Sequence, residues 1–267
     1  MRRREVIKLI AGSAAVWPLA ARAQLAREAS INIGVLTDMT GIFATLAGEG
    51  SVVAAHMAVE DFGGEVLGRK IRVLAGDHKH KAEVASAITT HWFNDDHVGM
   101  AVDMPNSVVA LAMQKLAATR DRISITVSGG SSDLTGKDCT HTGFHWAYDT
   151  YSNTAGMAPA MVGFGLDTWY FITADYAFGW SLEQDASAAV EKAGGRVIGR
   201  SRHPFNANNF TPFLTAAQDS GAKVIALANA GGDTINAVKQ AAEIGISPRS
   251  QTLVPLLVFI SDVDSLG

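Results

Sequence analysis

Hydroxyl, amide and glycine residues gather in two short loops of the chain, and both loops have the chemistry to bind an anion. The first contains Asn106 and Ser107. We expect Ser107 to cap the helix that follows, so that the first N–H groups of this helix face a ligand. The second loop contains Ser128, Gly129, Gly130 and Ser131. Glycine lets a ligand approach the backbone closely. Each loop alone could be an ordinary turn, but two at neighbouring strand ends predict a shelf that binds a carboxylate.

A third loop places two aromatic side chains at the start of a helix. Residues 175–179 follow a predicted strand and include Tyr176 and Phe178. Aromatic residues are more often packed than exposed, yet a loop between a strand and a helix is an exposed place for them. These two side chains are therefore candidates for ligand contact.

The motifs that support enzymatic chemistry are missing from the sequence. The loop after the first predicted strand is not a G-x-G-x-x-G turn, and the chain has no phosphate-binding G-x-x-x-x-G-K-[ST] motif. The nucleophile elbow G-x-S-x-G is also absent. Cys139 is the single cysteine, so it has no partner for an internal disulfide and makes a poor metal site with a lone histidine. We expect a binding protein without catalysis, cofactor or metal.

The N-terminal residues resemble an export signal. Arg2, Arg3, Arg4 and Lys8 precede an uncharged apolar stretch at residues 9–21, and Ala21-Arg22-Ala23 fits a signal-peptidase site. We expect residues 1–23 to be a signal peptide that is cleaved near Ala23, which makes the mature protein periplasmic. Residues 3–8 resemble the twin-arginine motif, and an ordinary secretory signal is the alternative. The apolar stretch is too short to span a bilayer.

The charge of the remaining chain argues against nucleic acid as a partner. The whole sequence has a formal net charge of −4, and residues 1–23 hold five basic side chains and one acidic one. The rest of the chain is therefore acidic, whereas phosphate contacts need clustered Lys and Arg. The one basic cluster, residues 78–81, is predicted to be a solvated loop.

Short apolar runs alternate with longer amphipathic segments, a pattern typical of an α/β fold with parallel sheets. The predicted strands are residues 31–36, 71–75, 98–102, 123–127, 169–173, 196–199, 224–228 and 252–259. The predicted helices are residues 51–62, 81–94, 107–120, 152–164, 181–193, 211–220 and 233–244. We expect two doubly wound, Rossmann-like lobes, residues 24–147 and 148–267, with a ligand beyond the carboxyl ends of their strands.

Several segments together resemble the type I periplasmic solute-binding proteins of ABC importers, the Leu/Ile/Val-binding protein family. The similar segments are residues 33–37, Thr40-Gly41, Gly63-Gly64, residues 67–71, 128–135 and 175–179. The resemblance extends over residues 30–262. It implies a periplasmic monomer that binds a small molecule between its lobes by hinge closure and delivers it to ABC permease subunits. A receptor of the same fold that serves a signalling partner is the alternative.

The resemblance also implies positions for the ligand contacts. The carboxylate-binding loops correspond to Asn106 and Ser107 and to residues 128–131. The loop after the first strand, which supplies a lid, corresponds to Phe43 and Leu46. The contacts from the second lobe correspond to Tyr176, Phe178 and Asn229.

The sequence departs from this family in two ways. Amino-acid binders carry an acidic residue after the last predicted strand to pair with the ligand ammonium, but residues 254–259 contain none and the next acid is Asp262. Because an unpaired buried ammonium is costly, an aromatic or aliphatic acid is favoured over a branched-chain amino acid. Family members also continue with a segment that returns to the first lobe. We expect this return segment to be absent, which would leave the fold incomplete at the C-terminus.

Overall fold

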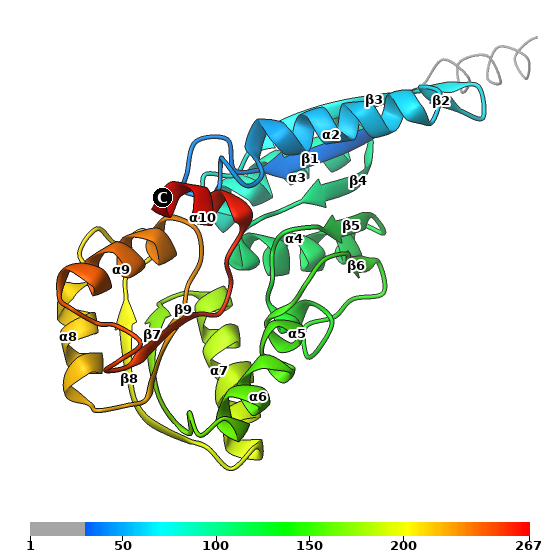
Figure 1. Ribbon diagram of the computed structural model, residues 1–267. Coiled ribbons are helices and arrows are strands. Elements are labelled where there is room, and N and C mark those ends of the chain that lie inside the picture. Colours follow the sequence, from blue (N-terminus) through cyan, green and yellow to red (C-terminus); the bar gives the residue numbers. More distant parts are fainter. Residues whose placement is uncertain (1–29) are drawn as a thin grey trace, which may run out of the picture.

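Two separate sheets organise residues 30–267, which are the residues that the computed structural model describes (Figure 1). The expected signal peptide and its cleavage near Ala23 lie outside these residues. The first sheet consists of β1 (Ile31–Thr37), β2 (Glu65–Val66), β3 (Arg69–Asp77), β4 (Val98–Asp103), β5 (Ile123–Thr126) and β6 (Gly143–His145). The second consists of β7 (Thr168–Ala174), β8 (Arg196–His203), β9 (Val224–Ala228) and β10 (Thr252–Pro255).

The first sheet is doubly wound, as the sequence predicted. Its strand order is β2-β3-β1-β4-β5-β6, and all pairs are parallel apart from the short β2. The helices α3 (Ala82–Asn94) and α4 (Ser107–Thr119) pack on one face, and α2 (Gly48–Asp61) lies against β1 and β3. Trp92 of α3 lies on Gly34, where a Cβ atom would come within 2.4 Å of the indole ring. A residue without a side chain therefore allows this helix to approach the sheet closely.

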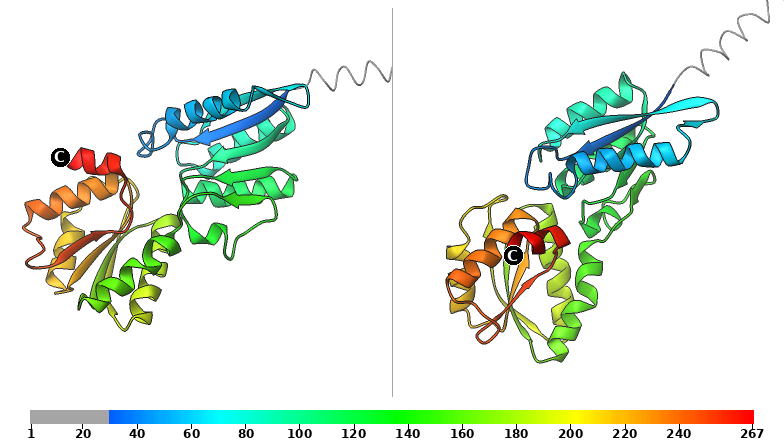
Figure 2. Two further views of the ribbon diagram at one scale, coloured as in Figure 1. Left: turned by 45° about the vertical axis from the view of Figure 1, so that its right-hand side comes forward. Right: turned by 45° about the horizontal axis from the view of Figure 1, so that its top comes forward.

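The second sheet is also parallel, in the order β10-β9-β7-β8. One face is covered by α7 (Ala177–Lys192), beside which lie α5 (Thr150–Ala155) and α6 (Met157–Gly163). The other face is covered by α8 (Thr211–Asp219) and α9 (Gly232–Glu243), and α10 (Ile260–Leu266) lies beside α9. Figure 2 shows from two further directions that the two lobes are distinct bodies joined by the green segment before α5.

The central strand β7 explains why strands of this lobe look uniformly apolar in the sequence. Trp169 and Phe171 belong to the core under α7, whereas Tyr170 and Ile172 belong to the core under α8 and α9. Successive side chains of a strand point to opposite faces, and both faces here are covered by helices. Each of the four positions 169–172 therefore meets a hydrophobic core.

Most of the predicted elements are present, and the differences have local causes. The helix expected at residues 152–164 is divided at Gly156 into α5 and α6. Pro159 contributes to the break because it has no N–H for the carbonyl of Ala155. The strand expected at residues 252–259 ends at Pro255, which pairs with Leu227 near the end of β9. The short strands β2 and β6 and the helix α10 were not expected.

The connection between the sheets contains the expected boundary between residues 147 and 148. This point lies between the end of β6 at His145 and the start of α5 at Thr150. We keep it as our proposed division of the lobes. Within residues 30–267, no helix combines the length and the apolar character needed to cross a membrane.

Candidate ligand-binding site

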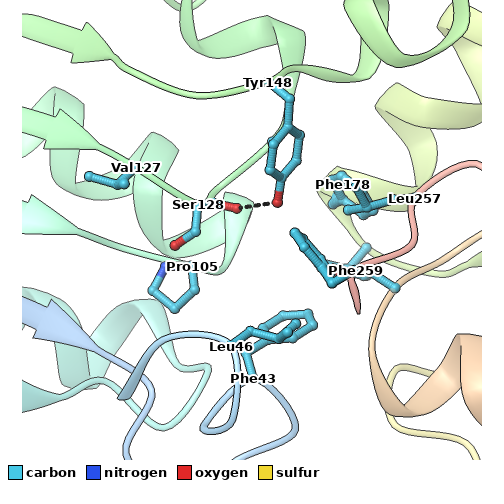
Figure 3. Close-up of a pocket in the computed structure, with 12 residues that line it drawn as sticks. Phe43, Leu46, Pro105, Val127, Ser128, Tyr148, Phe178, Leu257 and Phe259 are labelled. Carbon is cyan, nitrogen blue, oxygen red and sulfur yellow. Dashed lines mark hydrogen bonds between the residues drawn. The ribbon is translucent and has the colours of Figure 1, made fainter. Parts of the chain in front are cut away.

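A cavity of about 200 Å³ lies between the two lobes (Figure 3). Its lining residues all follow a strand, at the edge of the sheet where the carboxyl ends of parallel strands meet. The first lobe contributes Phe43, Leu46, Pro105, Val127, Ser128 and Gly130. The second lobe contributes Tyr148, directly after the boundary, and Tyr176, Phe178, Ala230, Leu257 and Phe259. This is where doubly wound sheets place their ligands.

The lining is mostly apolar and contains no acidic or basic side chain. Its polar side chains are the hydroxyls of Ser128, Tyr148 and Tyr176. Ser128 Oγ donates a hydrogen bond to Asp103 Oδ1 at 2.8 Å. Tyr148 Oη donates to the carbonyl oxygen of Ser128 at 3.3 Å (Figure 3). The cavity can therefore orient a ligand by a few neutral hydrogen bonds while it contacts the rest by apolar surface.

Both tyrosine hydroxyls keep their protons at neutral pH. Burial, with a smaller contribution from the charge of Asp262, raises the pKa of Tyr148 to about 12. Burial raises the pKa of Tyr176 further, and the nearby Asp233 adds to this shift. Both neutral phenols are O–H donors, and Tyr148 already donates its proton to the carbonyl oxygen of Ser128.

Aromatic rings from both lobes form the walls of the cavity. The ring centroid of Tyr148 lies 5.8 Å from that of Phe259, and the centroid of Tyr176 lies 6.1 Å from that of Phe178. Aromatic pairs at these separations contribute attraction beyond the surface that they bury. A flat aromatic ligand would find similar contacts between these walls.

Gly130 is placed where a side chain would enter the cavity walls. A Cβ atom at this position would lie 2.9 Å from Cε2 of Phe178 and 3.0 Å from Cε2 of Tyr148. Only a residue without a side chain lets the loop after β5 approach both rings this closely.

A buried network holds the loop that carries Phe43. Asp38 Oδ2 accepts a hydrogen bond from Phe43 N at 2.9 Å and lies 2.6 Å from His80 Nε2. Burial alone would raise the pKa of Asp38, but the hydrogen bonds from His80, Phe43 and Gly41 together hold this pKa below its ordinary value. His80 Nδ1 lies 3.2 Å from Asn106 Nδ2, so the network connects the loops after β1 and β4. Phe43 is thereby fixed at the contact between the lobes.

The prediction of a solvated loop at residues 78–81 was wrong for its two histidines. His78 is fully buried, and burial lowers its pKa to about 4. Its Nδ1 accepts a hydrogen bond from the backbone N–H of His80 at 3.0 Å. The sequence suggested a solvent-exposed loop because Lys79 and Lys81 alternate with the histidines. In the structure the two lysines are exposed, whereas the histidine side chains lie in the protein interior.

Six of the eleven predicted site residues line the cavity. These are Phe43, Leu46, Ser128, Gly130, Tyr176 and Phe178. They come from three loops that the sequence places far apart, after β1, β5 and β7. Their contact with a ligand remains a prediction.

The other five predicted residues lie outside the lining and support it. Ser107 was expected to cap α4, but the cap is Asn106, whose Oδ1 accepts from Val108 N at 2.9 Å. Ser107 Oγ instead accepts from Ser131 N at 3.2 Å. The remaining two, Gly129 and Asn229, are buried, and Asn229 bonds to His203 and Thr234.

Sequence reasoning missed the other six lining residues, among them Tyr148, Leu257 and Phe259. Tyr148 follows β6, a strand too short to be recognised, so it was interpreted only as part of the boundary between the lobes. Leu257 and Phe259 were included in a strand that in fact ends at Pro255. Pro255, which cannot donate a hydrogen bond to a neighbouring strand, was the available signal that the strand ends there. Among residues 30–267, no group of three or more His, Cys, Asp or Glu side chains is arranged to hold a metal ion.

Comparison with known proteins agrees with this architecture. The sequence model described as "Periplasmic binding protein" matches residues 30–267. A periplasmic binding protein from Burkholderia mallei has a similar solved structure, with 43% sequence identity and a TM-score of 0.87. The alignment covers 90% of this chain and 64% of that one. No curated protein matches the sequence.

Two further solved structures are similar. One is a branched-chain amino acid ABC transporter periplasmic ligand-binding protein from Burkholderia xenovorans, 31% identical with a TM-score of 0.75, covering 89% of this chain and 64% of that one. The other is an ABC transporter solute-binding protein from Rhodopseudomonas palustris in complex with p-hydroxybenzoic acid. It is 21% identical with a TM-score of 0.81, covers 89% of this chain and 65% of that one, and supports the fold alone. The chain thus spans less than two thirds of the length of these proteins.

Proposed function

The chain belongs to the periplasmic binding protein family, and on this basis we propose that it is the substrate-binding component of an ABC transporter. It captures a small organic carboxylate between its lobes by hinge closure and delivers it to permease subunits at the inner membrane. The observation that carries the proposal is the cavity at the carboxyl ends of both sheets, whose lining offers neutral hydroxyls and apolar walls. The protein acts as a periplasmic monomer and without catalysis.

The size and walls of the cavity favour an aromatic acid. An apolar protein cavity of about 150 Å³ accepts benzene, and the cavity here measures about 200 Å³. One ring with a small substituent therefore fits, between walls that include Tyr148, Phe178 and Phe259. Aliphatic acids of similar volume fit less well, because they lose the ring contacts.

An amino acid is the competing ligand, and the charge of the lining argues against it. No acidic side chain lines the cavity to pair with an ammonium group. Asp262 is the first acidic residue after residues 254–259 in the sequence. It is buried, and its Oδ2 accepts a hydrogen bond from Phe259 N at 3.0 Å. An ammonium buried without a partner would cost several kcal/mol.

Calorimetric titration tests this ligand class. We expect the purified chain to bind benzoate more tightly than leucine or valine, because only the amino acids must bury an ammonium. Phe178→Ala removes a wall of the cavity and should weaken benzoate binding by about tenfold or more. Phe164→Ala is the matched control, because Phe164 is 86% exposed and does not line the cavity. Tight binding of leucine without binding of benzoate would contradict the proposal.

A further inference from the structure

We propose that the cavity selects ligands that carry a hydrogen-bond donor, such as a phenolic hydroxyl, through Ser128 Oγ and Tyr148 Oη acting as acceptors. The proposal rests on the cavity being the ligand site and specifies which acids it prefers. A hydroxyl group has one proton and two lone pairs. Once its proton is donated inside the protein, it can only accept from a ligand.

The proton of Ser128 is committed to Asp103. The distance from Ser128 Oγ to Asp103 Oδ1 is 2.8 Å, and an ionised carboxylate oxygen can only accept. The second oxygen of Asp103, Oδ2, is buried and has no partner among residues 30–267. If Ser128 turned its proton toward a ligand, Asp103 would lose this hydrogen bond in a buried setting, which is costly. Ser128 Oγ therefore presents lone pairs to the cavity.

The proton of Tyr148 is committed in the same region. Its Oη donates to the carbonyl oxygen of Ser128 at 3.3 Å, and Figure 3 shows the hydroxyl directed toward that loop. The two acceptor oxygens therefore belong to residues that are hydrogen-bonded to each other, and both residues line the cavity. A donor on the ligand has two alternative partners there.

Tyr176 is the lining hydroxyl that keeps its proton for the ligand. Within residues 30–267, no hydrogen bond of its Oη is found. The lining thus offers acceptors at Ser128 and Tyr148 and a donor at Tyr176. This pattern matches an acid with a hydroxyl substituent better than an unsubstituted acid.

The proposal is tested by calorimetric titration with 3- and 4-hydroxybenzoate and with the corresponding 3- and 4-methylbenzoates. Methyl and hydroxyl groups are similar in size, so each pair differs mainly in the donor. We expect the wild-type protein to bind the better hydroxybenzoate about tenfold more tightly than its methyl counterpart. Ser128→Ala should reduce this ratio several-fold. Ser124→Ala is the control with the same substitution, because Ser124 is buried on β5 and does not line the cavity.

If Ser128→Ala does not fold, Tyr148→Phe is a second variant. We expect it, too, to reduce the ratio of hydroxybenzoate affinity to methylbenzoate affinity. Equal affinity of the wild-type protein for the two members of each pair would overturn the donor selection but leave the proposed function intact. A ratio that is unchanged in both variants would also overturn it. If the wild-type protein binds none of the benzoates, the proposed ligand class fails as well.

Discussion

At the scale of single residues, several ionisable groups are buried and depend on backbone hydrogen bonds. Asp233 at the start of α9 is 2% exposed, and its carboxylate accepts from Asn206 N at 3.1 Å and from Ala207 N at 2.8 Å. Burial outweighs these two hydrogen bonds and raises the pKa of Asp233 from 3.8 to about 6. The folded protein therefore holds a proton on Asp233 at pH values where the unfolded chain has released it.

This shift predicts how stability depends on pH. The raised pKa of Asp233 stabilises the folded state below about pH 4, and this stabilisation is lost as pH rises through about 6. Two pKa units correspond to roughly 3 kcal/mol. Urea denaturation should therefore show Asp233→Asn gaining up to that amount relative to wild type between about pH 4 and pH 7. Asp219→Asn, on the exposed end of α8, is the control. A difference that does not change with pH would contradict the assignment.

At the scale of elements, the start of α4 connects a helix to the candidate site. Asn106 has an extended backbone, and its Oδ1 accepts from the N–H groups of Val108 and Val109. Its Nδ2 lies near His80 Nδ1, so the His80 Nε2 proton is directed to Asp38. One side chain thus caps α4 and orients the network that holds the loop after β1.

Two substitutions separate these roles. Asn106→Ala removes both the cap and the contact with His80 and should lower the free energy of unfolding by about 1–2 kcal/mol or more. Asn106→Asp keeps an oxygen for the cap but loses the amide donor, so it should retain more stability than Asn106→Ala. Urea denaturation measures both variants. An aspartate variant as unstable as the alanine variant would show that the cap contributes little.

At the scale of the whole molecule, several contacts join the lobes, among them an aromatic pair and a hydrogen bond on opposite sides. Phe43 of the first lobe is 5% exposed within the core of the second lobe, and its ring centroid lies 6.1 Å from that of Phe205. On the other side, Ser132 Oγ of the first lobe donates to Asp185 Oδ2 of α7 at 2.8 Å. The cavity lies where the Phe43 loop meets the second lobe, so this loop contributes both to the contact and to the lining.

Removing the ring of Phe43 should loosen the lobes. Phe43→Ala deletes a buried aromatic side chain. In a rigid core this change lowers the free energy of unfolding by about 3–5 kcal/mol, and we expect a smaller loss here because the lobes can separate. We expect a larger radius of gyration in X-ray solution scattering and benzoate binding that is weaker by about tenfold. The exposed Phe164→Ala again serves as the control. An unchanged radius of gyration together with unchanged affinity would show that Phe43 does not hold the lobes together.

Much of the fold could be predicted because its signals are local. The apolar runs of β1, β4, β7 and β9 and the amphipathic segments between them are properties of neighbouring residues. The same pattern predicted β5, so the loops with Ser128 and Phe178 were found from the strand ends, whereas Phe43 was implied by the family resemblance. The short strand β6 has too few residues for its pattern to be recognised, so Tyr148 was missed.

The class of fold, the strand ends that face the site and the neutral chemistry of the loops there could all be inferred from local sequence patterns. Which side chains of each loop line the cavity could not, because that depends on packing between elements that are distant in the chain. The tertiary structure also decided the direction of each hydroxyl. The proton of Ser128 is bound to Asp103, 25 residues away, so a residue expected to donate to a ligand is left as an acceptor.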